Sequence, residues 1–105
     1  MELSDWELLL GSPPRGKVYY FNPVFGDPKP ERSFDYLMLT FPNDLHIEIQ
    51  WDFERWKYRV SLTKERFDTL IEERFCDDAI SAVQAVKELV EIERSNNGVI
   101  CNYQA

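Results

Sequence analysis

Few side chains in this 105-residue chain are of the types that catalyse reactions. The only histidine is His46, and the two cysteines are Cys76 and Cys101. A nucleophilic triad requires a histidine that reaches a serine or a cysteine, and no motif here brings one to His46. A single histidine on a strand is usually a solvated side chain, so we expect no catalytic residue. An enzyme that combines His46 with a carboxylate remains an alternative.

The two cysteines have none of the neighbours that zinc sites require. The first residues show neither the basic segment nor the apolar core of a signal peptide, which predicts a cytoplasmic protein with reduced thiols. Whether Cys76 and Cys101 meet in the fold stays open, because spacing alone does not show proximity. A position just before a helix would lower the pKa of Cys76, but Asp77 and Asp78 would oppose that shift.

The densest acidic cluster consists of Glu72, Glu73, Asp77 and Asp78. Four carboxylates can hold a hard cation such as Ca²⁺. Arg66 and Arg74 lie among them, however, and such mixed charge is more typical of a solvated face. The chain also has no zinc or calcium-loop motif and no glycine-rich phosphate loop. We therefore expect neither a metal ion nor a cofactor.

The formal net charge is −7 and the sequence pI is about 4.6. This charge repels the phosphates of nucleic acids and of anionic membranes. No apolar run approaches the ~18 residues of a membrane-spanning helix. The charge therefore favours a basic protein as the partner and disfavours direct binding to nucleic acid or to a membrane.

The elements that position these residues follow from the hydrophobic pattern. Apolar and polar residues alternate over 45–51 and again over 56–63, which predicts an antiparallel hairpin. Segments 17–21 and 34–41 also have strand composition, giving a meander of three to four strands. The expected pairs are Leu37–Ile49, Leu39–Ile47, Ile47–Val60 and Ile49–Tyr58 on the buried face, with Met38–Glu48, Glu48–Arg59 and Gln50–Lys57 on the other.

Three helices are expected beside these strands. A capping box from Ser4 to Glu7 predicts a short helix over 5–10. Helical spacing of apolar residues predicts a second helix over 64–74, with a strand over 69–76 as the alternative. The main helix, over 78–95, has one apolar stripe and ends at Asn96-Asn97-Gly98. We therefore predict a single α+β domain in which the helices pack on one face of an antiparallel sheet.

A proline-rich segment over 22–33 is expected to form the longest irregular loop, with Phe25 at its centre. Long ordered loops often carry function, although this one can equally be a plain connection. Phe25 is therefore included among the candidate binding residues.

The sheet face without helices is the expected binding surface. Its candidate residues are Tyr36, Met38, His46, Glu48, Gln50 and Arg59, together with Phe25 and the acidic residues Glu72, Glu73, Asp77 and Asp78. The predicted function is a small acidic cytosolic protein-binding module of the inhibitor, immunity or anti-defence type. Its carboxylates would occupy the place of nucleic-acid phosphates on a basic or nucleic-acid-handling protein.

Two further functions remain as alternatives to this module and to the His46 enzyme. The first is a homodimeric accessory subunit that pairs through the open face or an edge strand. The second is an RNA-binding domain, since a helix, three strands and a helix invite comparison with double-stranded RNA-binding domains. That module needs lysines at the start of its last helix, where this chain has Asp77 and Asp78, so RNA binding is disfavoured.

Overall fold

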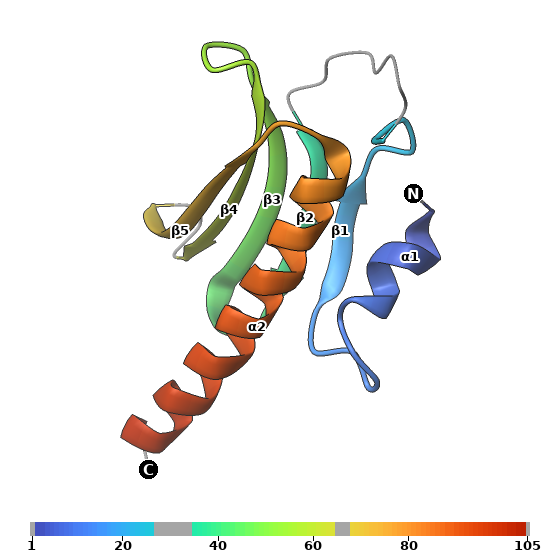
Figure 1. Cartoon of the computed structure of the whole chain (residues 1–105). Helices are drawn as coiled ribbons and strands as arrows, with labels where there is room; N and C mark the ends of the chain where they lie inside the picture. Colours follow the sequence, from blue (N-terminus) through green and yellow to red (C-terminus); the bar gives the residue numbers. More distant parts are fainter. Residues whose placement is uncertain (1, 27–34, 65–67, 105) are drawn as a thin grey trace.

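The chain forms a five-stranded antiparallel sheet with a helix near each end (Figure 1). The computed structural model describes residues 2–26, 35–64 and 68–104, the stretch 96–104 as backbone alone. Neighbouring strands in the sheet are also neighbours in the chain, so the sheet is a simple meander. Its elements are α1 (Leu3–Leu8), β1 (Lys17–Phe21), β2 (Asp35–Phe41), a 3₁₀ turn (Pro42–Asp44), β3 (Leu45–Asp52), β4 (Lys57–Lys64), β5 (Thr69–Cys76) and α2 (Ala79–Gln104). The predicted α+β meander is confirmed.

The fifth strand replaces the helix predicted over 64–74, and that prediction is wrong. β5 pairs antiparallel with β4, from Tyr58↔Cys76 to Lys64↔Thr69. Apolar residues in this segment satisfy the periods of both a helix and a strand. Without β5, one edge of β4 would have no neighbour in the sheet. The backbone N–H and C=O groups of residues 69–76 find hydrogen-bond partners there, which favours the strand over the helix. Phe67, which contributed to the helical pattern, lies outside the described residues.

The predicted pairing of β2 with β3 is confirmed, whereas that of β3 with β4 is wrong by two residues. Ile47 lies opposite Leu62 and Ile49 opposite Val60, because the last pair is Asp52↔Lys57 and the four-residue turn lies at 53–56, one residue later than predicted. Oδ1 of Asp52 accepts hydrogen bonds from the turn amides of residues 54 and 55, at 2.9 and 3.0 Å. A slip of two residues preserves the inward and outward faces, so the predicted faces of both strands still hold.

Tyr36 and Phe25 belong to the core, and their prediction as surface residues is wrong. β2 has a bulge between Asp35 and Leu37, so Tyr36 is an extra residue that breaks the alternation. Its ring centroid lies 5.5 Å from those of Phe25 and Tyr58, and both Tyr36 and Phe25 are buried. Phe25 ends a turn in which its amide donates to the carbonyl of residue 22, and residues 27–34 of the predicted loop lie outside the described part.

The long helix α2 crosses one face of the sheet and packs against β3, β4 and β5 (Figure 1). The predicted apolar stripe supplies its buried residues, with Ala82, Val86, Leu89 and Val90 fully or nearly buried. The helix does not end at Asn96-Asn97-Gly98 as predicted. Glycine costs an existing helix only about 1 kcal/mol relative to alanine, which weakens a helix without stopping it.

The short helix α1 begins and ends two residues earlier than the predicted helix over 5–10. It reaches the same core through Trp6, and Leu10, just beyond the helix, is also buried. Its capping differs from the prediction, because the cap residue is Glu2 rather than Ser4. The Glu2 amide donates to Oδ2 of Asp5 at 2.8 Å. Acidic side chains are favourable at this end of a helix, and Asp5 satisfies an amide that otherwise lacks a partner.

Candidate functional site

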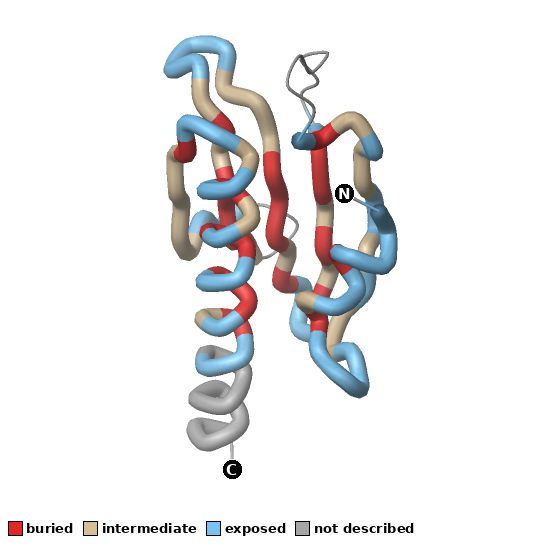
Figure 2. The backbone as a smooth tube through the Cα atoms, turned by 45° about the vertical axis from the view of Figure 1, so that its right-hand side comes forward, coloured by how far each residue is buried: buried red, intermediate tan, exposed pale blue. Residues whose placement is uncertain are grey.

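The sheet face turned away from α2, here called the outer face, carries most of the predicted binding residues. Along β3, His46, Glu48 and Gln50 alternate with core residues such as Ile47 and Ile49. α2 packs on the opposite face, and the Trp6 ring of α1 contacts Phe25 in that same core, at 5.6 Å between centroids. Among the described residues, no helix lies over the outer face (Figures 1 and 2).

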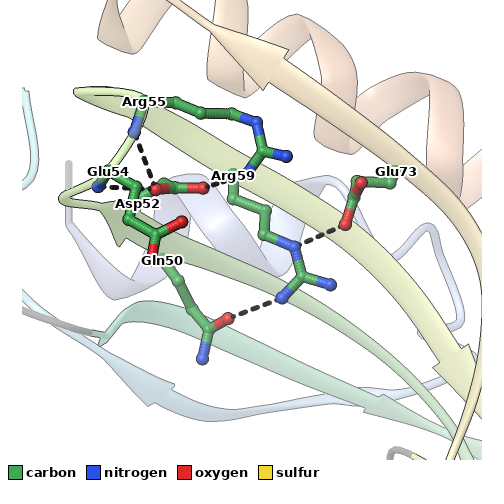
Figure 3. A network of polar contacts seen from close by, with 6 residues as sticks. All are labelled: Gln50, Asp52, Glu54, Arg55, Arg59 and Glu73. Atoms are coloured by element: carbon green, nitrogen blue, oxygen red, sulfur yellow. Dashed lines mark hydrogen bonds and ion pairs between the residues drawn. The ribbon is translucent and has the colours of Figure 1, made fainter.

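Arg59 organises a network of hydrogen bonds across the outer face (Figure 3). Its Nε donates to Oε2 of Glu73 on β5 at 2.6 Å, and its Nη1 donates to Oε1 of Gln50 on β3 at 3.3 Å. Gln50 Nε2 in turn donates to Oδ1 of Asp35 on β2 at 3.1 Å. Arg59 therefore links β3, β4 and β5 across the outer face, and Gln50 extends the network to β2.

Glu48 lies at the centre of the outer face and is buried, with 8% of its surface exposed. Its neighbours on the adjacent strands are Met38 and Ser61, which flank it on both sides. Burial raises the pKa of Glu48 and the nearby Asp35 raises it further, while Arg59 and then His46 oppose the shift. Glu48 is therefore less available to a partner than its place on the open face suggests.

The enzyme alternative requires a carboxylate near His46, and the structure places Asp44 within hydrogen-bond distance of its ring. Nε2 of His46 lies 2.9 Å from Oδ1 of Asp44, in the turn before β3. Whether Nε2 of His46 donates a hydrogen bond to Asp44 depends on the tautomer of the imidazole ring. His46 and Glu48 share the outer face, but the hollow described below lies at its other end, over Gln50 and Arg59.

The β3–β4 connection carries exposed aromatic side chains, and we call residues 51–56 the hairpin end. It projects beyond the rest of the sheet, at the top of Figure 1. Phe53 is 43% exposed and Trp56 is 56% exposed, with ring centroids 6.3 Å apart. The Trp56 ring also packs edge-on against half-buried Trp51 at 5.4 Å. The hairpin end therefore presents a partly exposed cluster of aromatic rings that pack on one another.

Trp56 adopts a left-handed backbone conformation, with φ of 58°. This conformation is uncommon for residues other than glycine and is costly for a bulky side chain. Sequence reasoning missed this feature because it placed Trp56 inside the strand, opposite Trp51. The sequence did contain a signal: the short connection between the two strands holds two bulky aromatic residues, Phe53 and Trp56, where polar turn residues are usual.

A shallow hollow of about 350 Å³ joins the hairpin end to the outer face. It is lined by Gln50, Trp51, Asp52, Phe53, Glu54 and Arg59. The backbone amide of Arg55 is the main cause of the lowered pKa of Asp52, and the Arg55 guanidinium contributes to it. That guanidinium also lies 4.5 Å from the ring centroid of Phe75, a cation–π contact.

The predicted acidic cluster is divided among separate roles. Glu73 binds Arg59 on the outer face, and Glu72 forms an ion pair with Arg74. Asp77 is largely exposed and lies 3.3 Å from Nζ of Lys57. Asp78 caps α2 by accepting a 2.7 Å hydrogen bond from a backbone amide of the first turn, which lowers its pKa. Within the described residues, no group of three or more His, Cys, Asp or Glu side chains is placed to hold a metal ion.

Cys76 is a buried free thiol at the end of β5. Burial is the main cause of its raised pKa, and the carboxylates of Asp78 and Asp77 add to it. A raised pKa keeps the thiol protonated and unreactive. The side chain of Cys101 lies outside the described residues, so its proximity to Cys76 stays open.

The helices of the described part include none long and apolar enough to cross a membrane. The chain matches no protein-family model, no curated protein and no solved structure.

Proposed function

We propose that this protein is a small acidic protein-binding module that contacts a basic partner through the hairpin end and the adjoining outer face. The observation that carries the proposal is Trp56, a large aromatic residue that is 56% exposed in a costly backbone conformation. Strained, exposed residues are kept where the strain serves a function. Tryptophan is also enriched among the few residues that supply most of the binding energy at protein interfaces.

The geometry of the hairpin end supports a role in binding rather than in core packing. The Phe53 and Trp56 rings contact each other, and Trp51 supports the Trp56 ring from below. Aromatic rings held in place by neighbours lose little conformational entropy on binding. The nearby Arg59–Gln50 and Arg59–Glu73 contacts would give this aromatic centre a polar rim.

The charge of the chain supports a basic partner. A net charge of −7 on 105 residues would attract a basic protein at long range and repel nucleic acid. Exposed carboxylates such as Glu54 and Asp77 could then occupy the positions that phosphates take on a nucleic-acid-handling protein. Inhibition of such a protein, as by an immunity or anti-defence protein, is the form of this function that we propose.

Site-specific cross-linking tests this proposal. We would replace Phe53 with a photoreactive phenylalanine analogue and irradiate the folded protein in lysate of its source cells. We expect a cross-link to a basic protein from this position and none from the same analogue at Leu8, which is exposed on α1. The same products from both positions, or none from Phe53, would contradict the proposal. A cross-link to a second copy of the chain would favour the homodimer alternative.

A further inference from the structure

The sheet has a second exposed feature, a groove between its last strand and α2. Its lining includes no residue of the hairpin end, although Arg55 of the hairpin end contacts Phe75 in the groove. β5 is an edge strand that pairs with β4, and the start of α2 lies beside it (Figure 1). The groove has a volume of about 430 Å³. It is lined by Arg74, Phe75 and Cys76 of β5 and by Ile80, Ser81, Gln84, Ala85 and Glu88 of α2.

We propose that this β5–α2 groove binds an extended basic segment of a partner protein, which adds to the sheet as a sixth strand beside β5. The proposal goes beyond the function proposed above, because it concerns another surface and a defined mode of binding. It shares with that function only the basic character of the partner.

The edge of β5 supplies the backbone part of this site. Within the described chain, β5 pairs with β4 alone, so alternate N–H and C=O groups along β5 point away from the sheet. An extended peptide can bind such an edge through main-chain hydrogen bonds, while side-chain pockets select its sequence. α2 forms the second wall beside this edge, so the site is a groove and not an open strand edge.

The first turn of α2 supplies an apolar contact. Ile80 is 84% exposed, the highest value among the large hydrophobic side chains that the structure describes. It lies on the groove together with the small residue Ala85, one and a half turns further along the helix. An exposed isoleucine beside the edge of β5 gives an apolar side chain of an added strand a surface to cover.

Charge selects a basic occupant for the groove. The carboxylates of Asp77, Asp78 and Glu88 all act on Cys76 in the groove wall, where each raises the thiol pKa. The single basic lining residue, Arg74, forms an ion pair with Glu72. Two further cations lie near the groove and each has a carboxylate partner: Lys57 pairs with Asp77, and Arg55, which contacts Phe75, pairs with Asp52. Carboxylates therefore still outnumber cations around the groove, which attracts lysine and arginine side chains. A second copy of this chain, also at −7, would be repelled from the same place.

The other edge strand offers a poorer site for such a segment. β1 has a register irregularity between Val18 and Tyr20. Bulges of this kind twist an edge away from further pairing. β5 has a register irregularity of its own, opposite Leu62 and Thr63 of β4, but Arg74, Phe75 and Cys76 in the groove lie beyond it, in the regular run from Glu72 to Cys76. We therefore expect strand addition along this run of β5 rather than at β1.

A synthetic peptide of alternating lysine and valine, capped at both ends, is the probe for this inference. Titration into the ¹⁵N-labelled full chain should shift the amide resonances of β5 and of the first turns of α2. The same peptide with N-methyl groups on alternate residues keeps its charges but loses backbone donors, and should bind at least about tenfold more weakly. Equal affinity of both peptides, or shifts on β1 instead of β5, would overturn the inference.

Variants of the chain separate this groove from the hairpin end. Ile80→Ser and Glu88→Gln should each weaken binding of the peptide at least about threefold. Leu8→Ser, a matched change at an exposed leucine of α1, should leave the affinity unchanged. Trp56→Ala should also leave it unchanged, because Trp56 lies on the other surface. Unchanged affinity in both groove variants would overturn the inference and leave the function proposed for the hairpin end untouched.

Discussion

Arg15 and Glu93, 78 residues apart in the chain, form a two-pronged ion pair that fixes α2 to the connection between α1 and β1. Nη2 of Arg15 lies 2.8 Å from Oε1 of Glu93, and Nε donates to Oε2 at 3.2 Å. The Glu93 side chain is fully buried, whereas that of Arg15 is 30% exposed. A buried carboxylate requires such a partner, so this pair holds both ends of the chain on the same face of the sheet.

Removing the arginine should therefore destabilise the fold strongly. We expect Arg15→Ala to lower the free energy of unfolding by about 3 kcal/mol, because it leaves the Glu93 carboxylate buried without its guanidinium. Urea denaturation measures the change. The double variant Arg15→Met/Glu93→Leu should recover most of the loss, since it removes both charges. A double variant as unstable as Arg15→Ala would contradict this explanation.

Trp6 offers a test of how the aromatic core is held together. Its ring is fully buried against Phe25, but its indole N–H has no hydrogen-bond acceptor among the described residues. We expect Trp6→Ala to cost about 3–5 kcal/mol through loss of packing. Trp6→Phe should cost less than about half of that, because no hydrogen bond is lost. Equal losses in the two variants would show that the N–H does have a partner.

Glu48 should make the stability depend on pH in a direction opposite to that of most carboxylates. Burial raises its pKa above 4.5, so the folded state keeps this proton where the unfolded state has released it. Stability should therefore fall as the pH rises from about 4.5 through the raised pKa. Glu48→Gln should gain stability relative to the wild type over this range, as measured by urea denaturation at a series of pH values.

Asp78 provides the control of opposite sign for that experiment. The hydrogen bond from the backbone amide of Ser81 lowers the pKa of Asp78 below 3.8, so its contribution is present above that pH and lost as the pH falls. Asp78→Asn should therefore be less stable than the wild type at pH 7, with the difference shrinking in acid. The same trend in both variants would contradict the assignment for Glu48.

The conformation of Trp56 leads to a prediction about stability and function together. Glycine adopts positive φ without steric cost, whereas other residues lose about 1–2 kcal/mol there. We therefore expect Trp56→Gly to be about 1 kcal/mol more stable than Trp56→Ala, although both lose the exposed ring. Thermal unfolding of the two variants measures this difference. If Trp56→Gly is the less stable, the strain attributed to this residue is absent in solution.

The sequence predicted the parts of the fold that depend on alternation over several residues. The faces of β3 and β4 came out correctly even though their register slipped by two, because an even slip changes no face. The stripe of α2 was equally clear, and its residues Val86 and Leu89 are buried. Each of these two patterns extends over several residues, so one residue that departs from it does not change the prediction.

Single-residue irregularities account for most of the errors. The bulge at Tyr36 moved a predicted surface residue into the core, and the turn after β3 lies one residue later than predicted, where Asp52 accepts two of its backbone hydrogen bonds. Neither feature changes the hydrophobic pattern, so periodicity could not reveal it. The binding surface was predicted least well, because Trp56 belongs to the shifted turn and not to the following strand, where the sequence placed it.

The most direct test of the central proposal uses the partner identified by cross-linking at Phe53. The measurement is the dissociation constant between this partner and the double variant Phe53→Ala/Trp56→Ala. We predict that this variant, confirmed as folded by circular dichroism, binds the purified partner at least about tenfold more weakly than the wild type, mainly through faster dissociation. The control Leu8→Ala should bind as the wild type does. An unchanged dissociation constant for the double variant would contradict a binding role for the hairpin end.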